Sequence, residues 1–140
     1  MATDRPGSVL FACGMNSIRS PIASGLARHY YPTMYVRSAG VRRGQKDPFA
    51  IAIMEEMGLD ITGHEPRTFE ELEDSYFDLI ITLAPEAHHG ALELTRSMAV
   101  DVEYWPTQDP SLLHGSRDRI LDGYRIVREQ LATRIRKRFG

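Results

Sequence analysis

Hydrophobic and polar positions along this chain follow two periods, and their alternation predicts strands and helices in turn. Apolar runs of strand length occupy Ser8–Cys13, 79–83 and 100–105, and a shorter run at 35–36 leads into the segment 38–40. Uninterrupted runs of this length are typical of strands that are buried on both faces of a sheet. We therefore expect a strand at each of these places.

Between and after these runs, apolar residues recur at helical spacing. The predicted helix starts are, in chain order, Ser20 as N-cap before Pro21, Asp47 before Pro48, Pro85 before Glu86, and Ser116 as N-cap. The apolar faces are, in the same order, Ala23, Leu26, Ala27 and Tyr30; Phe49, Ile53, Met54 and Met57; Ala87, Ala91, Leu92 and Met98; and Ile120, Tyr124, Val127, Leu131 and Ile135. Gly58 is expected to end the second helix.

The order of these elements predicts an α/β fold of the Rossmann-like type. We expect three layers, α/β/α, with a four-stranded parallel sheet, helices on both faces and right-handed crossovers. The 140 residues suit a single domain, 1–140, because a chain of about 150 residues buries roughly two thirds of its unfolded surface. Ligands of such sheets bind at the carboxyl ends of the strands, and Cys13 lies at such an end.

Composition and charge narrow the classes of function. The net charge of −2 and the pI of 6.2 give no global basic field for nucleic acid. No apolar run reaches the about 20 residues that span a bilayer, and the first residues, MATDRPGS, hold no segment typical of a signal peptide. We therefore expect a cytoplasmic protein without a membrane or nucleic-acid partner. One cysteine allows no internal disulfide, so Cys13 would act as a thiol.

The segment 13–21, Cys-Gly-Met-Asn-Ser-Ile-Arg-Ser-Pro, joins the first strand to the first helix. Free backbone N–H groups and the helix dipole favour an anion at such a turn, and they would also favour the thiolate of Cys13. Arg19 offers a planar fork of donors for two phosphate oxygens, and Asn16 tolerates a left-handed backbone angle. The spacing Cys-x5-Arg is weak by itself, and Cys13 could instead be a buried core thiol.

The same segment resembles the phosphate-binding loop of low-molecular-weight protein tyrosine phosphatases, and the resemblance extends through nearly the whole chain. Further matches follow in order at 37–40 (Arg-Ser-Ala-Gly), at Asp47-Pro48, at 58–67 with His64, and at Asp109-Pro110. The resemblance implies the low-molecular-weight phosphatase fold and a phosphomonoester hydrolase. The implied substrate is a phosphotyrosine protein or a small aryl phosphate, and no metal or cofactor is implied. The oligomeric state stays open.

The resemblance also implies a role for each matching residue. Cys13 would attack phosphorus to form a cysteinyl-phosphate, and Asp109 would protonate the leaving oxygen and then activate water. The phosphate would lie against Gly14, Met15, Asn16, Ser17, Ile18 and Arg19. Ser20 would hydrogen-bond the sulfur of Cys13, and Ser38 with His64 would brace the side chain of Asn16.

The sequence departs from the family pattern in three places. Met15 stands directly before Asn16, where the family has glycine, and Ile18 replaces the second cysteine of many members. Where animal members place aromatic residues around the phosphotyrosine ring, this chain has Arg42, Arg43 and Lys46 on one loop and Ser111 and Leu112 on another. These departures weaken the phosphotyrosine assignment more than the phosphatase chemistry, and the arginines suggest an anionic substrate surface.

Two other classes of function stay open. An arsenate reductase uses a similar loop on this fold, and with one cysteine it would need an external low-molecular-weight thiol. A non-catalytic phosphate-binding or partner-binding module is the third class.

Single residues also have simpler alternative roles. Asp109 could serve only as a turn former, and His64 could be an exposed loop residue. His88 and His89 are expected on a helix surface.

Overall fold

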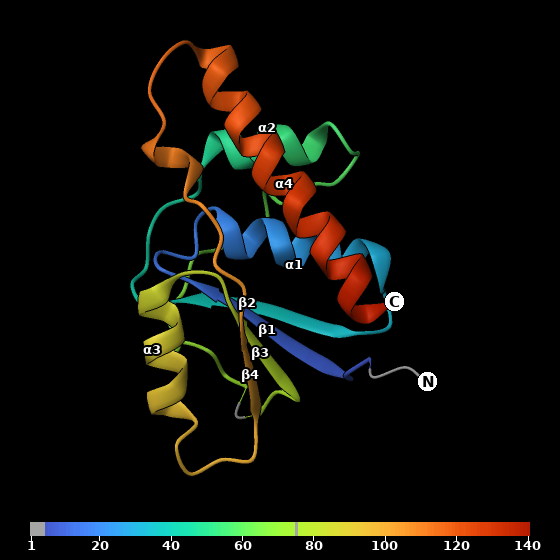
Figure 1. Cartoon of the computed structure of the whole chain (residues 1–140), viewed down its shortest axis with the longest axis vertical. Helices are drawn as coiled ribbons and strands as arrows, with labels where there is room; N and C mark the ends of the chain where they lie inside the picture. The colour runs from blue at the N-terminus through green and yellow to red at the C-terminus, as the bar shows by residue number, and fades with distance from the viewer. Residues whose placement is uncertain (1–4, 75) are drawn as a thin grey trace.

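Strands and helices alternate in the computed structural model, which describes residues 5–74 and 76–140 (Figure 1). The elements are β1 (Ser8–Cys13), α1 (Arg19–Tyr30), β2 (Tyr35–Gly40), α2 (Pro48–Glu55), β3 (Leu79–Thr82), α3 (Pro85–Leu94), β4 (Asp101–Tyr104), a 3-10 turn at Pro110–Leu112, and α4 (Arg117–Phe139). This order confirms the predicted α/β class. Among the described helices, none combines the length and apolar character that a membrane span needs.

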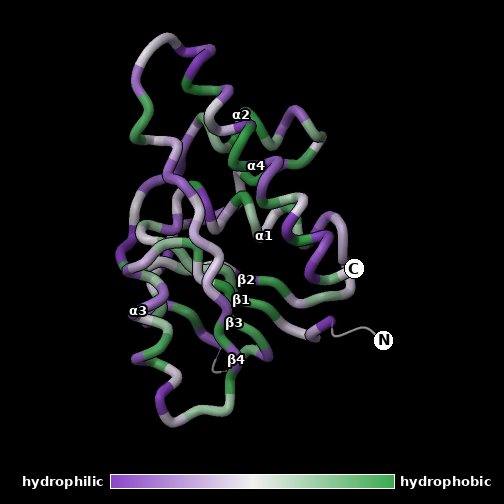
Figure 2. The backbone as a smooth tube through the Cα atoms, in the orientation of Figure 1, coloured by the Kyte–Doolittle hydropathy of each residue, from purple (hydrophilic) through white to green (hydrophobic). Residues whose placement is uncertain are grey.

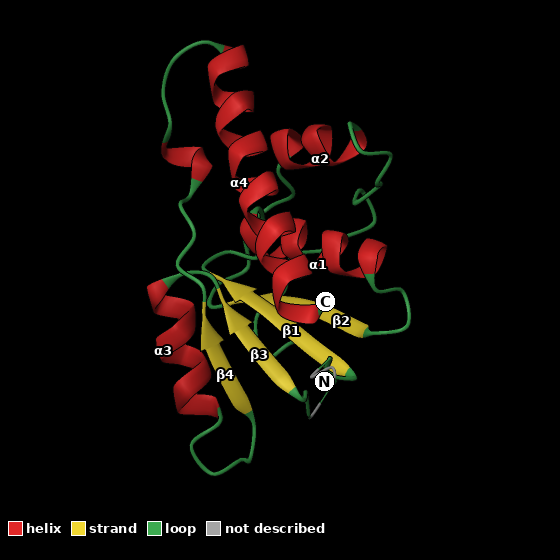
Figure 3. Ribbon diagram, turned by 45° about the vertical axis from the view of Figure 1, so that its right-hand side comes forward, coloured by secondary structure: helices red, strands yellow, loops and turns green. Residues whose placement is uncertain are grey.

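The four strands form one parallel sheet in the order β2-β1-β3-β4 (Figure 3). β1 lies at its centre, where Ala12 pairs with Ala39 of β2 and with Thr82 of β3. Because all strands run the same way, their carboxyl ends meet at one edge of the sheet. Cys13, which pairs with Gly40, is the last residue of the central strand at this edge.

Alternate residues of β1 face two different layers of helices. Val9, Phe11 and Cys13 join a core cluster that includes buried residues of α1, α2 and α4. Leu10 and Ala12 face the other way, against α3 and the segment that contains Phe69. Figure 1 shows α1, α2 and α4 grouped on one side of the sheet and α3 apart from them, and Figure 2 shows the inner strands coloured hydrophobic. The predicted three layers are therefore confirmed.

Four of the predicted helix boundaries agree with the structure, and one of them is the start of α3 at Pro85. Asp47 caps α2, since its Oδ1 accepts hydrogen bonds from the amides of Phe49 and Ala50. Ser116 caps α4 through the amide of Arg119. Gly58 follows α2 with a φ of 74°, in the left-handed region where glycine ends helices.

Two predictions at helix ends are wrong. α1 begins at Arg19 and its N-cap is Ile18, which makes no side-chain hydrogen bond, so Ser20 lies inside the first turn. Its hydroxyl contacts the sulfur of Cys13 and accepts from the side-chain Nδ2 of Asn16, and it does not cap the helix. α3 ends at Leu94, because Thr95 turns out of the helix, and Met98 is therefore exposed beyond it.

Candidate active site

The loop from Cys13 to Arg19 is held in place by a second loop that follows β2. The amides of Val41, Arg42 and Gly44 donate to the carbonyls of Cys13, Gly14 and Met15 at 3.2, 2.9 and 2.9 Å. The two backbones are so close that a Cβ on Gly40 would lie 2.7 Å from the amide nitrogen of Asn16. Glycine is therefore required at the end of β2 for the loop to close over it.

Asn16 is buried in the middle of this loop with a φ of 57°, the left-handed angle that the sequence suggested. Its Nδ2 donates to Ser20 Oγ at 2.9 Å and to Ser38 Oγ at 3.0 Å, and its Oδ1 accepts from the amide of Arg67 at 2.9 Å. The expected contact with Ser38 is present. The contact with the backbone amide of Arg67 could not be predicted, because a backbone donor leaves no pattern in the side chains.

His64 lies against the main chain of Asn16 and not against its side chain, which corrects the expected contact. Its Nε2 is 2.8 Å from the Asn16 carbonyl oxygen. The ring is half-buried, so the alternative of an exposed loop histidine is wrong. Burial lowers the pKa of His64, and the charges of Arg28 and Arg67 lower it further, although the hydrogen bond to the Asn16 carbonyl opposes them.

Cys13 is only 2% exposed, yet it borders a cavity of about 340 Å³. Its Sγ lies 2.9 Å from Ser20 Oγ, which is the contact that the family resemblance implied. The other residues that line this cavity are Met15, Ser17, Ile18, Arg19, Gly44, Gln45, Lys46, Asp47, Asp109 and Ser111. The thiol is thus buried as the core alternative requires, but it faces open space large enough for a phosphate group.

Arg19 and Asp109 meet at the edge of the same cavity. Arg19 Nη1 donates to the carbonyl of Thr107 at 2.9 Å, and its Nη2 lies 3.9 Å from Asp109 Oδ2. Asp109 also starts the 3-10 turn, since its Oδ1 accepts from the amide and the hydroxyl of Ser111 at 2.9 and 2.7 Å. The turn-former alternative is therefore correct for one carboxylate oxygen, while the other faces Arg19 and the cavity.

Asp47 is a cavity residue that the sequence marked only as a helix start. While its Oδ1 caps α2, its Oδ2 accepts the hydroxyl of Tyr124 at 3.0 Å. Burial raises the pKa of Tyr124 far above its usual value, and the carboxylates of Asp47 and then Asp109 raise it further. The helical spacing indicated Tyr124 as an apolar core residue, and its ring is indeed buried, but the spacing could not reveal the partner of its hydroxyl.

The basic residues of the loop after β2 are engaged with carboxylates. Arg42 pairs with Glu86 at 2.9 Å, Arg43 pairs with Glu71, and Lys46 lies 3.0 Å from Glu65. The two arginines on which the prediction of an anionic substrate rested do not line the cavity, and of the three basic residues only Lys46 does.

The two neighbouring histidines of α3 have different surroundings. His88 is half-buried, stacks on Tyr104 with ring centroids 4.7 Å apart, and places Nδ1 3.0 Å from Thr82 Oγ1. The expected surface position is wrong for His88 and correct for the exposed His89. In the described part of the chain, no group of three His, Cys, Asp or Glu side chains gathers as metal ligands would.

Comparison with protein families adds to this geometry. The family model described as low molecular weight phosphotyrosine protein phosphatase matches residues 8–138. Among curated proteins, the glutaredoxin arsenate reductase of a Synechocystis strain is 31% identical over 129 residues, which cover 91% of this chain and 92% of that protein. Other curated relatives at 28–29% identity, from Bacillus subtilis and Shouchella clausii, are also arsenate reductases.

Solved structures of both kinds of enzyme share the fold. An arsenate reductase in its phosphate-binding state has a TM-score of 0.77 and 30% identity, covering 93% of this chain and 94% of that one. A low molecular weight protein tyrosine phosphatase from T. tengcongensis also has a TM-score of 0.77, at 23% identity, with 93% and 95% covered. Its likeness concerns the fold alone.

Proposed function

We propose that this chain, which belongs to the low molecular weight phosphotyrosine protein phosphatase family, hydrolyses phosphomonoesters through the thiolate of Cys13. One observation carries the proposal. A sulfur, a guanidinium and a carboxylate, from Cys13, Arg19 and Asp109, border a single cavity at the carboxyl edge of the sheet. These groups are a nucleophile, an oxyanion ligand and an acid, which are the parts that the reaction needs.

In the first step, the thiolate of Cys13 attacks phosphorus. An S–P bond forms while the bond from phosphorus to the ester oxygen breaks, and Asp109 gives its proton to the departing oxygen. Arg19 and the free amides of the loop hold the equatorial oxygens, where negative charge gathers in the transition state. The Thr107 carbonyl fixes the guanidinium in place for this role.

In the second step, a water molecule attacks the cysteinyl-phosphate. Asp109, now ionised, takes a proton from the water while the water oxygen bonds to phosphorus and the S–P bond breaks. Inorganic phosphate leaves and the thiolate returns, so no further reactant is consumed. Two sets of contacts keep the nucleophile oriented. Ser20 holds the sulfur directly. The loop backbone is held at Asn16 by its contacts with Ser38, His64 and Arg67.

The lining of the cavity bears on the substrate. Met15, Gln45 and Lys46 are among the lining residues, and within the described chain the lining includes no aromatic ring that would hold a phosphotyrosine ring. A small phosphomonoester fits this lining better than a phosphotyrosine side chain. A reducing cytoplasm suits the chemistry, because Cys13 must remain a free thiol.

Arsenate reduction with an external thiol is the second candidate, and the names of the curated relatives favour it over hydrolysis. Arsenate would enter the same cavity and form an S–As bond with Cys13, releasing water. A low-molecular-weight thiol would then attack the sulfur, so that arsenite leaves with two electrons and a mixed disulfide remains. A second molecule of the thiol would regenerate Cys13. The single cysteine of the sequence makes both external thiols necessary, whereas hydrolysis needs neither.

A paired assay separates the two candidates. One preparation, in buffer with EDTA, is tested for phosphate release from phenyl phosphate and for arsenite production from arsenate with glutathione. We expect phosphate release without added thiol, its loss in Cys13→Ser, and a fall of about 10² to 10⁴ in Asp109→Asn, because phenolate is a poor leaving group. Asp122→Asn, on the exposed face of α4, is the matched control. Arsenite production without phosphate release would assign the chain to the reductases.

A further inference from the structure

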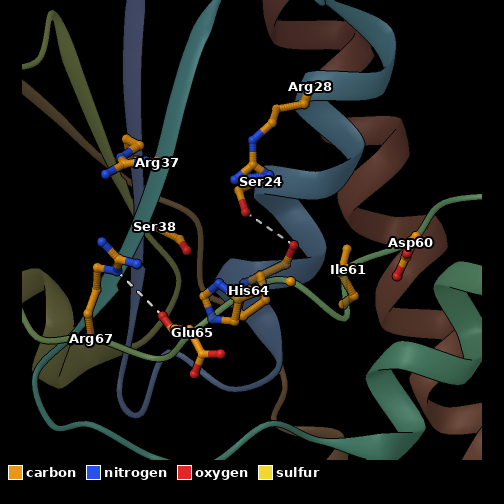
Figure 4. A pocket seen from close by; sticks show the side chains of 11 residues that line it. Ser24, Arg28, Arg37, Ser38, Asp60, Ile61, His64, Glu65 and Arg67 are labelled. Atoms are coloured by element: carbon orange, nitrogen blue, oxygen red, sulfur yellow. Dashed lines mark hydrogen bonds between the residues drawn. The ribbon is translucent and has the colours of Figure 1, made fainter.

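A second cavity, of about 300 Å³, lies beside the first and shares no lining residue with it. Its walls come from α1, β2 and the segment 60–67, and the residues are Pro21, Ser24, Arg28, Arg37, Ser38, Asp60, Ile61, Gly63, His64, Glu65 and Arg67. Figure 4 shows Arg28 extending from α1, with Arg37 and Arg67 lying together across the cavity from it. Three arginines and a histidine therefore surround one space.

The two carboxylates that line this cavity already have partners, and one of the three arginines is also paired. Asp60 accepts hydrogen bonds from the amide and the hydroxyl of Thr62, Glu65 pairs with Lys46, and Arg37 pairs with Asp74 at 3.3 Å. Within residues 5–74 and 76–140, no carboxylate lies within ion-pair distance of Arg28 or Arg67. The unpaired charge at the cavity is thus positive.

The cations also repel one another. Burial lowers the pKa of Arg28, and the charge of Arg37 lowers it further. Arg28 and Arg67 both lower the pKa of His64, as described above. Cationic groups on α1, on β2 and on the segment 60–67 therefore repel one another across the cavity, and an anion bound between them would relieve this repulsion.

We propose that this second cavity binds a small tetrahedral dianion, such as sulfate or phosphate, between Arg28, Arg37 and Arg67. Guanidinium groups suit such a ligand because each offers a planar pair of donors to two oxygens. The volume accommodates the ion with water around it. The site does not depend on the reaction at Cys13, so it stands whichever enzyme activity the chain has.

Occupancy of this site would reach the phosphate loop through Asn16. His64 Nε2 contacts the carbonyl oxygen of Asn16, the Arg67 amide donates to its side chain, and Ser38 accepts from it. An anion beside His64 would favour the imidazolium form and strengthen the donor to the Asn16 carbonyl. The site would therefore stabilise the left-handed turn on which the loop depends.

The test measures sulfate binding by calorimetry and the pKa of the His64 ring by NMR. Sulfate replaces chloride in the buffer so that the ionic strength stays constant. Sulfate is the probe because it is not hydrolysed and does not titrate near neutral pH. We expect two sites in the native protein and an upward shift of the His64 pKa on addition of sulfate. In Arg28→Gln/Arg67→Gln, one site should be weakened about tenfold or more and the His64 response should disappear. His64→Asn identifies the resonance.

Two controls separate this site from the Cys13 cavity. Arg19→Gln should lose the other sulfate site and keep the His64 response. Arg96→Gln, at an exposed arginine that follows α3 and pairs with Glu93, should change neither. Circular dichroism checks that each variant is folded, and the single variants Arg28→Gln and Arg67→Gln replace the double one if it is not. Equal sulfate stoichiometry and an equal His64 shift in the native and arginine-substituted proteins would overturn the proposal.

Discussion

At the scale of single residues, Asn16 is the point on which the site depends. It occupies the left-handed region, in which most side chains are strained by about 1 to 2 kcal/mol, and it offsets that strain with hydrogen bonds from every polar group of its side chain. Serine, threonine or alanine could not supply both a donor and an acceptor at this reach. The conformation of the loop is thus fixed by one amide side chain.

His64 gives this arrangement a pH dependence. Its pKa is lowered in the folded protein, whereas in the unfolded chain it returns to about 6.5. The unfolded state therefore binds more protons as the pH falls below that value, and the free energy of unfolding decreases on acidification. We expect a steeper loss of stability between about pH 7 and 5 in the native protein than in His64→Gln, measured by urea unfolding in chloride buffers.

The matched control for this prediction is His114→Gln, because His114 is exposed. Its curve should run parallel to that of the native protein. If the His64→Gln curve is also parallel, the burial of His64 does not contribute to the acid sensitivity, and its role in bracing Asn16 loses its energetic support.

Sequence reasoning located the residues whose partners are near in the chain and missed those held by the backbone of distant segments. Cys13 and Asn16 lie in one loop and Ser20 lies in the helix turn that follows it, and the family resemblance added the contacts of Ser20 and Ser38. The carbonyl of Thr107 and the amide of Arg67, which hold Arg19 and Asn16, leave no trace in side-chain patterns. Only the folded chain brings them together.

At the scale of elements, α2 is tied to α4 beside the Cys13 cavity. Asp47 uses one oxygen to cap α2 and the other to accept the Tyr124 hydroxyl, and Phe49 packs against the Tyr124 ring with centroids 5.4 Å apart. Because Asp47 also lines the cavity, the position of α2 sets one wall of the site.

A double-mutant cycle measures this tie. Tyr124→Phe should lower the free energy of unfolding by about 0.5 to 1.5 kcal/mol, because it removes one hydrogen bond and keeps the ring. Asp47→Asn keeps a cap with a weaker acceptor, and the double variant should lose less than the sum of the two. Tyr30→Phe is the control, because it removes a hydroxyl that accepts from Arg136 of α4 and does not contact Asp47. Additive losses would mean that the hydroxyl and the carboxylate do not interact.

The two wrong helix boundaries have the same physical origin. Ser20 before Pro21 has the sequence of a helix start, but its hydroxyl bonds to the sulfur of Cys13 and to the side-chain Nδ2 of Asn16. Met98 continues the helical spacing of α3, although Thr95 returns its hydroxyl to the Ala91 carbonyl and ends the helix. In both cases a polar side chain found a partner that the period of apolar residues does not record.

At the scale of the whole molecule, the alternation of apolar runs and helical faces was enough to predict the parallel sheet and its layers. The segment between α2 and β3 was not predicted in the same way, because it has no regular period. It joins the edge of the sheet through the pairing of Gly40 with Thr68 and places Phe69 against the α3 face. Long-range contacts of this kind, and not local propensity, bring His64 and Arg67 to the phosphate loop.

Because three loops from different strand ends form the Cys13 cavity, a bound oxyanion should stabilise the whole fold. At a sulfate concentration of about 100 times the Kd, binding adds about 2.7 kcal/mol, which raises the Tm of a chain of this size by on the order of 10 °C. Measured by calorimetry in Arg28→Gln/Arg67→Gln, the rise reports the Cys13 cavity alone. Adding Arg19→Gln to that background should remove most of the rise, because the guanidinium links the oxyanion to the Thr107 carbonyl and so to the end of β4. An unchanged rise would mean that sulfate binds elsewhere and that Arg19 does not hold the oxyanion.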